Sequence, residues 1–258
     1  MIVLNGIERP TEFEVENFLT NKALKLGERS CRGRKDEERA KICAIIFHTT
    51  KGIPGGKDLR PMVLKKGQGP NTKAGARTVS MWANDTTRYA GAHFIVDFDG
   101  SIYQCADVVL TATYHAELAN GRTVGIELCQ GKDAEVYEAQ MESGVNLANW
   151  LTEKLSIQRQ IPNKYQGPIE RLEGKLNTYG VFGHRDLTNR RGAGDPGDFI
   201  FQALKKAGFE SWDFKAGEDI TVWRDRQRDL GVPPDGQPGP KTVEALVDKG
   251  HPHGLWVE

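Results

Sequence analysis

The chain has 258 residues and a mass of 28.7 kDa, which is room for one large domain or for a large domain with a small one attached. Thirty-five Lys and Arg residues balance thirty-five Asp and Glu residues, so the formal net charge is zero, which argues against a protein that holds nucleic acid through bulk charge. With 38% hydrophobic and 27% charged residues, the composition is that of a soluble globular protein, and it excludes disorder along the whole chain.

Membrane insertion is not expected, because no apolar run approaches the roughly 18–20 residues that span a bilayer. The first residues have neither a basic region nor a long apolar region, so we expect synthesis in the cytoplasm without a secretory signal. The four cysteines form no Cys-x-x-Cys pair, which leaves zinc-ribbon and thioredoxin motifs without support. Unpaired thiols in a reducing compartment are the simpler interpretation.

Residues 1–91 contain one clear strand. Residues 1–42 have weak apolar patterning and are predicted to be an N-terminal segment, in which the basic stretch 21–41 is a solvated helix or loop. The apolar run 43–48 predicts a strand buried on both faces, as in the middle of an α/β sheet. Residues 52–91 are rich in Gly, Pro, Asn and Thr and predict long surface loops.

Four further elements follow along the chain. Residues 93–104 predict a hairpin around the turn dipeptide Asp99-Gly100, and residues 123–128 predict another strand. Apolar residues at spacings of three and four predict an amphipathic helix over 136–155. A second helix is expected over 199–208, with lysines in its last turn and a glycine at its end.

The C-terminal part is predicted to be a separate small unit. Residues 209–218 resemble a linker, and residues 219–258 form the unit that follows. Val222, Gln227 and Leu230 lie on helical spacing, and residues 241–246 begin another helix after a turn-rich link. The expected unit is therefore all-helical.

The strongest chemical signal combines two histidines and a carboxylate. His48 ends a predicted strand, while a polar, glycine-rich loop that separates His184 from Asp195 can bring these two side chains to one point. Imidazole and carboxylate ligands suit zinc, and three protein ligands leave a fourth position for water. Asp195 is also a candidate N-cap of the following helix, and Asp186 and Asp198 are rival carboxylate ligands.

Five motifs together resemble the zinc N-acetylmuramoyl-L-alanine amidases of the amidase-2 family, to which peptidoglycan recognition proteins are related. They occur in the family's order between residues 43 and 208, and they are Phe47-His48, the stretch 92–104, Tyr114-His115-Ala116, Val124-Gly125-Ile126-Glu127-Leu128, and Gly183-His184-Arg185-Asp186 with Asp195-Pro196-Gly197. The resemblance implies an α/β fold in which helices flank a mixed central β-sheet, with a zinc amidase domain over 43–208.

The resemblance also implies roles for individual residues. His48, His184 and Asp195 correspond to the ligands of one zinc ion, and Glu127 corresponds to the general base. A basic residue before the last ligand stabilises the oxyanion in the family; here Arg191 is the closest match and Arg190 the next, with solvent-facing arginine as the alternative. His115 corresponds to a groove histidine that contacts substrate or stabilises the oxyanion. His93 is interpreted as structural.

The function implied is hydrolysis of the amide between N-acetylmuramic acid and the L-alanine of the peptidoglycan stem peptide. The tail resembles a peptidoglycan-binding type 1 module that lacks one helix. A phage endolysin, or a lytic effector delivered to a competitor's cell wall, fits a chain without a secretory signal, and we expect a monomer. The alternative is a peptidoglycan-recognition protein that binds in the same groove without catalysis.

Overall fold

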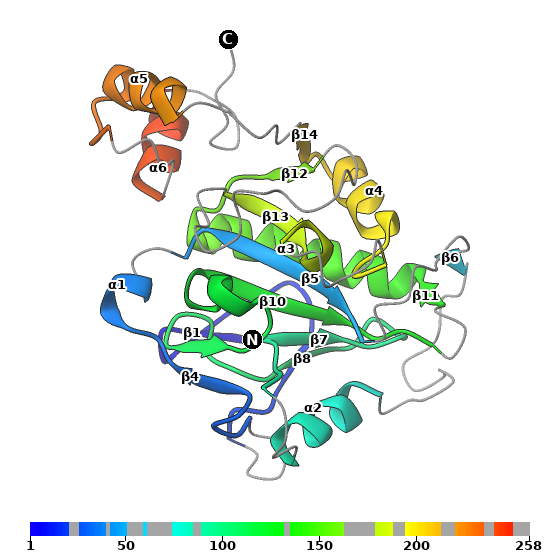
Figure 1. Cartoon of the computed structure of the whole chain (residues 1–258). Coiled ribbons are helices and arrows are strands. Elements are labelled where there is room, and N and C mark those ends of the chain that lie inside the picture. Colours follow the sequence, from blue (N-terminus) through cyan, green and yellow to red (C-terminus); the bar gives the residue numbers. More distant parts are fainter. Residues whose placement is uncertain are drawn as a thin grey trace.

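A computed structural model describes most of the chain (Figure 1). The described residues are 1–20, 26–39, 42–50, 59–60, 74–84, 89–131, 135–162, 179–187, 194–212, 220–234 and 240–249. None of the described helices combines the length and the apolar character needed to cross a bilayer.

The centre of the fold is a six-stranded mixed sheet, as predicted (Figure 1). Its strands, in spatial order, are β13 (Gly180–Gly183), β5 (Ala44–Thr49), β10 (Thr123–Leu128), β7 (Phe94–Val96), β8 (Ile102–Gln104) and β3 (Val15–Asn17). The first four run parallel, β8 is antiparallel to β7, and β3 is parallel to β8. Because β13, β5 and β10 are parallel, their carboxyl ends meet at the same edge of the sheet.

Helices cover both faces of this sheet. On one face α3 (Glu138–Leu155) and α4 (Asp198–Lys206) pack on alternate strand residues such as Phe47 and Ile126. On the other face α2 (Ala74–Asn84) covers the β7–β8 hairpin. Strand residues alternate between faces, so His48 and Glu127 point away from the α3 side.

Most elements predicted from the sequence are confirmed. The strands over 43–48 and 123–128 are β5 and β10, the hairpin is β7–β8 with Gly100 at a φ of 81°, and the two helices are α3 and α4. The prediction that residues 52–91 form only loops is wrong, because α2 lies within them. Val79 and Trp82 of α2 are buried three residues apart, an apolar stripe too narrow to stand out against the surrounding polar residues.

Short elements complete the described fold. They are β1 (Ile2–Leu4), β2 (Ile7–Arg9), β4 (Cys31–Gly33), α1 (Asp36–Arg39), β6 (Leu59–Arg60), β9 (Thr111–Thr113), the 3₁₀ turns η1 (Glu117–Arg122) and η3 (His184–Asp186), β11 (Val136–Tyr137), β12 (Gln160–Pro162) and β14 (Glu210–Trp212). In the tail, α5 (Ile220–Leu230) and α6 (Pro240–Asp248) pack through Leu230 and Leu246, and Gln227 Nε2 donates to Thr242 Oγ1 at 3.2 Å. The predicted turn at 235–239 lies outside the described residues.

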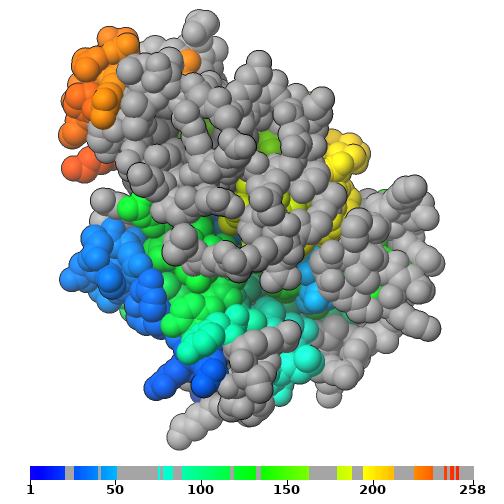
Figure 2. Space-filling model, in the orientation of Figure 1, coloured from blue at the N-terminus to red at the C-terminus, as the bar shows by residue number. Residues whose placement is uncertain are grey.

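The N-terminal segment is built into the sheet domain. β3 forms one edge of the central sheet, and β4 pairs with β9 in an antiparallel ladder. The space-filling view shows the blue N-terminal residues lying against the green part of the chain (Figure 2). The described part of the stretch 21–41 is therefore not simply a solvated helix or loop.

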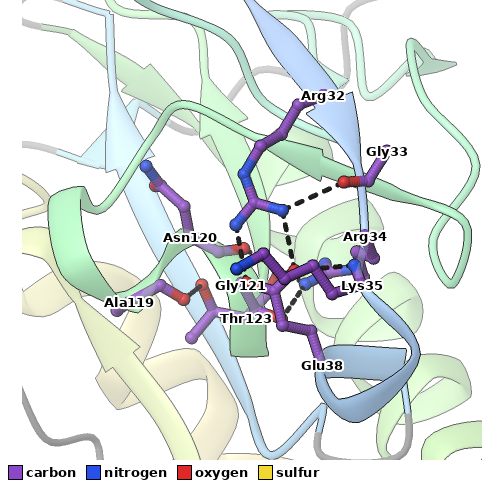
Figure 3. Close-up of polar contacts among 9 residues, drawn as sticks. All are labelled: Arg32, Gly33, Arg34, Lys35, Glu38, Ala119, Asn120, Gly121 and Thr123. Atoms are coloured by element: carbon purple, nitrogen blue, oxygen red, sulfur yellow. Dashed lines mark hydrogen bonds and ion pairs between the residues drawn. The ribbon is translucent and has the colours of Figure 1, made fainter.

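Arg34 is the clearest sign of this integration, since it is only 2% exposed. Figure 3 shows the polar contacts around its side chain. Its guanidinium donates to the carbonyls of Asn120, Gly121 and Thr123 at 3.1, 2.5 and 2.6 Å. Burial lowers the pKa of Arg34 to about 10, which still leaves it charged at neutral pH. One buried cation thus fixes the backbone that enters β10.

We expect Arg34→Met to destabilise the fold strongly, by about 3 kcal/mol or more, because buried carbonyls lose charge-assisted hydrogen bonds. Arg32→Met is the matched control, since Arg32 pairs bidentately with Glu38 at a partly exposed site. That change should cost no more than about 1 kcal/mol. Urea denaturation of both variants measures the difference, and equal losses would contradict the role given to Arg34.

Candidate metal centre

Three of the predicted site residues meet at the carboxyl edge of the parallel strands. His48 is the fifth residue of β5, and His184 follows directly after β13, the neighbouring strand. Asp195 returns to this edge just before α4. All three are buried, at 4%, 4% and 2% exposure.

The ligand atoms of these three side chains all lie within 4.8 Å of one another. Nδ1 of His48 is 3.8 Å from Asp195 Oδ1, and Nδ1 of His184 is 3.4 Å from Asp195 Oδ2. The two imidazole rings are 4.7 Å apart between centroids and are nearly perpendicular, at 72°. Among the described residues, this is the one group of three side chains arranged to hold a metal ion.

The chemistry of this donor set fits zinc. Neither ring nitrogen of the buried His184 has a hydrogen-bond partner among the described residues. A buried polar atom without a partner costs about 1–3 kcal/mol, and such atoms at a native site call for an explanation such as a bound ion. A metal ion held between the two imidazoles and the Asp195 carboxylate would give these nitrogens a partner.

Backbone contacts set the position of Asp195. Its Oδ1 accepts the Thr49 N–H at 3.0 Å, and its carbonyl accepts the Arg185 N–H at 2.8 Å. These bonds join Asp195 to the ends of the two strands that position His48 and His184. The alternative role of Asp195 as helix N-cap is wrong, because Gly197 is the N-cap of α4.

The rival carboxylates lie elsewhere. Asp186 accepts the Gly183 N–H at 2.8 Å, and burial raises the pKa of its carboxyl to about 6. Asp198 bonds Arg185 Nη2 at 2.5 Å and has a side chain that is 63% exposed. Neither belongs to the group of ligand atoms around Asp195.

Glu127 lies beside His48 in the sheet. The two residues are register partners in the parallel pair β10–β5, so their side chains leave the same face. Neighbouring strands are about 4.8 Å apart, which puts Glu127 and His48 side by side on this face of the sheet. Glu127 is 9% exposed, on the face opposite α3.

His115 is placed differently from the groove position that the resemblance implies. It is buried, its Nδ1 is 3.1 Å from His48 Nε2, and its Nε2 is 3.0 Å from Thr123 Oγ1. Both ring nitrogens are therefore engaged inside the protein, which leaves neither to contact substrate or an oxyanion. Burial lowers the pKa of His115 well below its ordinary value, with further contributions from nearby His93, His184 and Arg34.

His93 has the environment of a structural residue. Its Nδ1 accepts the Gly125 N–H at 3.0 Å, and its Nε2 is 2.9 Å from the Thr111 carbonyl. Burial, reinforced by the charge of Arg34, lowers the pKa of His93 to about 3 and keeps the ring neutral. Arg190 and Arg191 lie outside the described residues.

Sequence reasoning missed the supports of the site. Gly125 leaves space for His115, because a Cβ there would lie 2.7 Å from His115 Cγ and Nδ1. Thr123 and Arg34 hold the same region through hydrogen bonds. The glycine inside a predicted strand was a usable signal, since such a residue often marks a close approach.

Residues 38–198 match the family profile described as N-acetylmuramoyl-L-alanine amidase, which is more than half of the chain. The chain belongs to this amidase family. A comparison with curated protein sequences finds no significant match.

Solved structures of N-acetylmuramoyl-L-alanine amidases and of peptidoglycan recognition proteins are similar to this chain. The N-acetylmuramoyl-L-alanine amidase LysC of Clostridium intestinale is 17% identical, with 74% of this chain and 97% of that chain covered and a TM-score of 0.40. Drosophila peptidoglycan recognition protein SD is 12% identical, with 78% and 100% covered and a TM-score of 0.46. Drosophila PGRP-LB is 16% identical, with 79% and 99% covered and a TM-score of 0.49.

Proposed function

We propose that this protein is a zinc-dependent peptidoglycan amidase that cleaves the amide between N-acetylmuramic acid and the L-alanine of the stem peptide. The convergence of His48, His184 and Asp195 within 4.8 Å, in a chain of the amidase family, carries the proposal. These three residues would hold one zinc ion. When bound, zinc supplies a Lewis acid that lowers the pKa of water from about 16 to about 7.

Glu127 is proposed as the general base. Its position next to His48 suits a carboxylate that takes a proton from the attacking water and passes it to the leaving amine nitrogen. Arg191 is the first candidate for stabilising the oxyanion, and Arg190 is the second. A cation beside the amide oxygen stabilises the negative charge that develops on it during the reaction.

The alternative is a binding protein that recognises peptidoglycan in the same groove without cleaving it. Peptidoglycan recognition proteins, whose name describes binding, are among the solved structures that are similar to this chain. A complete set of buried ligand side chains together with Glu127 favours hydrolysis, because binding alone does not need a base beside the metal group.

Metal removal tests the function directly. Treatment with a chelator should abolish release of new N-terminal alanine from purified peptidoglycan, and one equivalent of zinc should restore it. Zinc stoichiometry by atomic emission and amine release are measured on the same samples. One zinc per folded chain with no amine released would favour the binding protein instead.

The tail and the route to the substrate are further parts of the proposal. We propose that residues 219–258 contact peptidoglycan and tether the enzyme to an insoluble substrate. The protein would act as a monomer on the cell wall after release or delivery, as an endolysin or a lytic effector with antimicrobial action. Co-sedimentation with purified walls should be weaker for residues 1–218 than for the full chain; equal sedimentation would remove the tail's role.

A further inference from the structure

A chain of buried hydrogen bonds runs from the 3₁₀ turn η1 to the metal centre. Thr123 Oγ1 donates to the Ala119 carbonyl at 2.9 Å, a bond drawn in Figure 3. The same oxygen is 3.0 Å from His115 Nε2, and His115 Nδ1 is 3.1 Å from His48 Nε2. Four residues are thus connected in series, three of them within residues 115–123 and the fourth, His48, on β5.

The direction of each bond follows from the number of hydrogens. A hydroxyl has one hydrogen, and that of Thr123 goes to the Ala119 carbonyl, so Thr123 Oγ1 must accept from His115 Nε2–H. In the neutral ring of His115, Nδ1 is then the acceptor, and His48 Nε2 must carry the hydrogen that it receives. His48 is left with a lone pair on Nδ1, the nitrogen on the side of Asp195.

That lone pair is what a metal ligand requires. A histidine binds a metal through its unprotonated nitrogen, and the partner of its other nitrogen decides which nitrogen that is. We propose that His115 and Thr123 are positioning residues that hold His48 in the tautomer able to bind the metal. This inference rests on the proposed zinc-dependent function.

Further contacts around His115 fix the position of its ring in this chain of hydrogen bonds. The absent Cβ of Gly125 gives the ring its place, and Asn120 Oδ1 accepts the backbone N–H groups of His115 and Ala116 at 2.9 and 2.6 Å. The carbonyl of Asn120 in turn accepts from Arg34. The buried arginine of the N-terminal segment therefore supports the ring that orients His48.

Thr123→Val and Thr123→Ser form a matched pair for the test. Valine keeps the shape and the strand propensity of threonine but removes the acceptor of His115 Nε2–H, whereas serine retains the hydroxyl. We expect zinc affinity, measured by competition with a fluorescent chelator, to fall about 10–100-fold in Thr123→Val. Thr123→Ser should stay close to wild type. Wild-type zinc affinity in a folded Thr123→Val protein would overturn the proposal.

The tautomers themselves provide a second measurement that needs no variant. In zinc-free wild-type protein with ¹⁵N-labelled histidine, long-range ¹H–¹⁵N correlation spectra should show His48 and His115 both protonated on Nε2. A hydrogen on Nδ1 of either ring would overturn the proposal, even if Thr123→Val failed to fold. Failure of the wild-type protein to bind zinc would instead count against the proposed function, so the two ideas fail separately.

Discussion

His184→Ala is expected to lose zinc and amide cleavage together. This histidine is one of the three converging side chains proposed to hold zinc, and its ring nitrogens have no hydrogen-bond partner among the described residues that would give it a separate structural role. Loss of a partner behind a ligand already costs about 10–100-fold in metal affinity, so loss of the ligand itself should exceed about 100-fold. Zinc titration of the purified variant and alanine release from peptidoglycan measure both effects.

The fold should survive this change. His184 lies at the edge of the sheet, and an alanine there removes a polar side chain that lacks protein hydrogen bonds. Asp198→Asn is the matched control, because Asp198 is the rival carboxylate and an amide oxygen can still accept from Arg185. The control should bind zinc as wild type does. A His184→Ala protein that keeps one tightly bound zinc would remove His184 from the ligand set.

The sequence predicted that these three side chains meet because each has a local signal. His48 is a polar residue at the end of an otherwise apolar run, and such a residue emerges where a buried strand stops. His184 and Asp195 flank a glycine-rich loop that can fold back, and the hydrogen bond from the Thr49 N–H to Asp195 Oδ1 holds Asp195 at the end of β5. Local pattern therefore located the donors, and family resemblance selected Asp195 among three nearby carboxylates.

The supports of the site had no comparable signal. Arg34 lies in a stretch of sequence in which most residues are charged, so nothing marks it as buried. Its burial depends on the pairing of β4 with β9, a strand that lies far along the chain. Thr123 is one of many strand threonines, and only the fold places its hydroxyl between Ala119 and His115. The contacts of Arg34 depend on long-range register, which the sequence does not reveal, whereas those of Thr123 depend on the fold of the eight residues before it, which include the 3₁₀ turn η1. The resemblance implies a groove position for His115, and only the contact with His48, 67 residues away, places its ring behind that histidine.

Glu127→Gln separates the reaction from the metal. The amide has nearly the shape of the carboxylate, so the sheet and the three ligands should remain in place, and the variant should still bind one zinc. The turnover number should nevertheless fall by about 10²–10⁴-fold, the usual contribution of a positioned base, because an amide cannot take a proton from water.

Cleavage and zinc binding of Glu127→Gln are compared with those of His184→Ala. Both variants should lose cleavage, but only His184→Ala should lose zinc, which assigns the two residues to different steps. Glu153→Gln controls for the loss of one negative charge, since the side chain of Glu153 is 71% exposed on α3. It should turn over at the wild-type rate. Wild-type turnover in Glu127→Gln with zinc bound would require another base, while loss of zinc in that variant would make Glu127 part of the metal group itself.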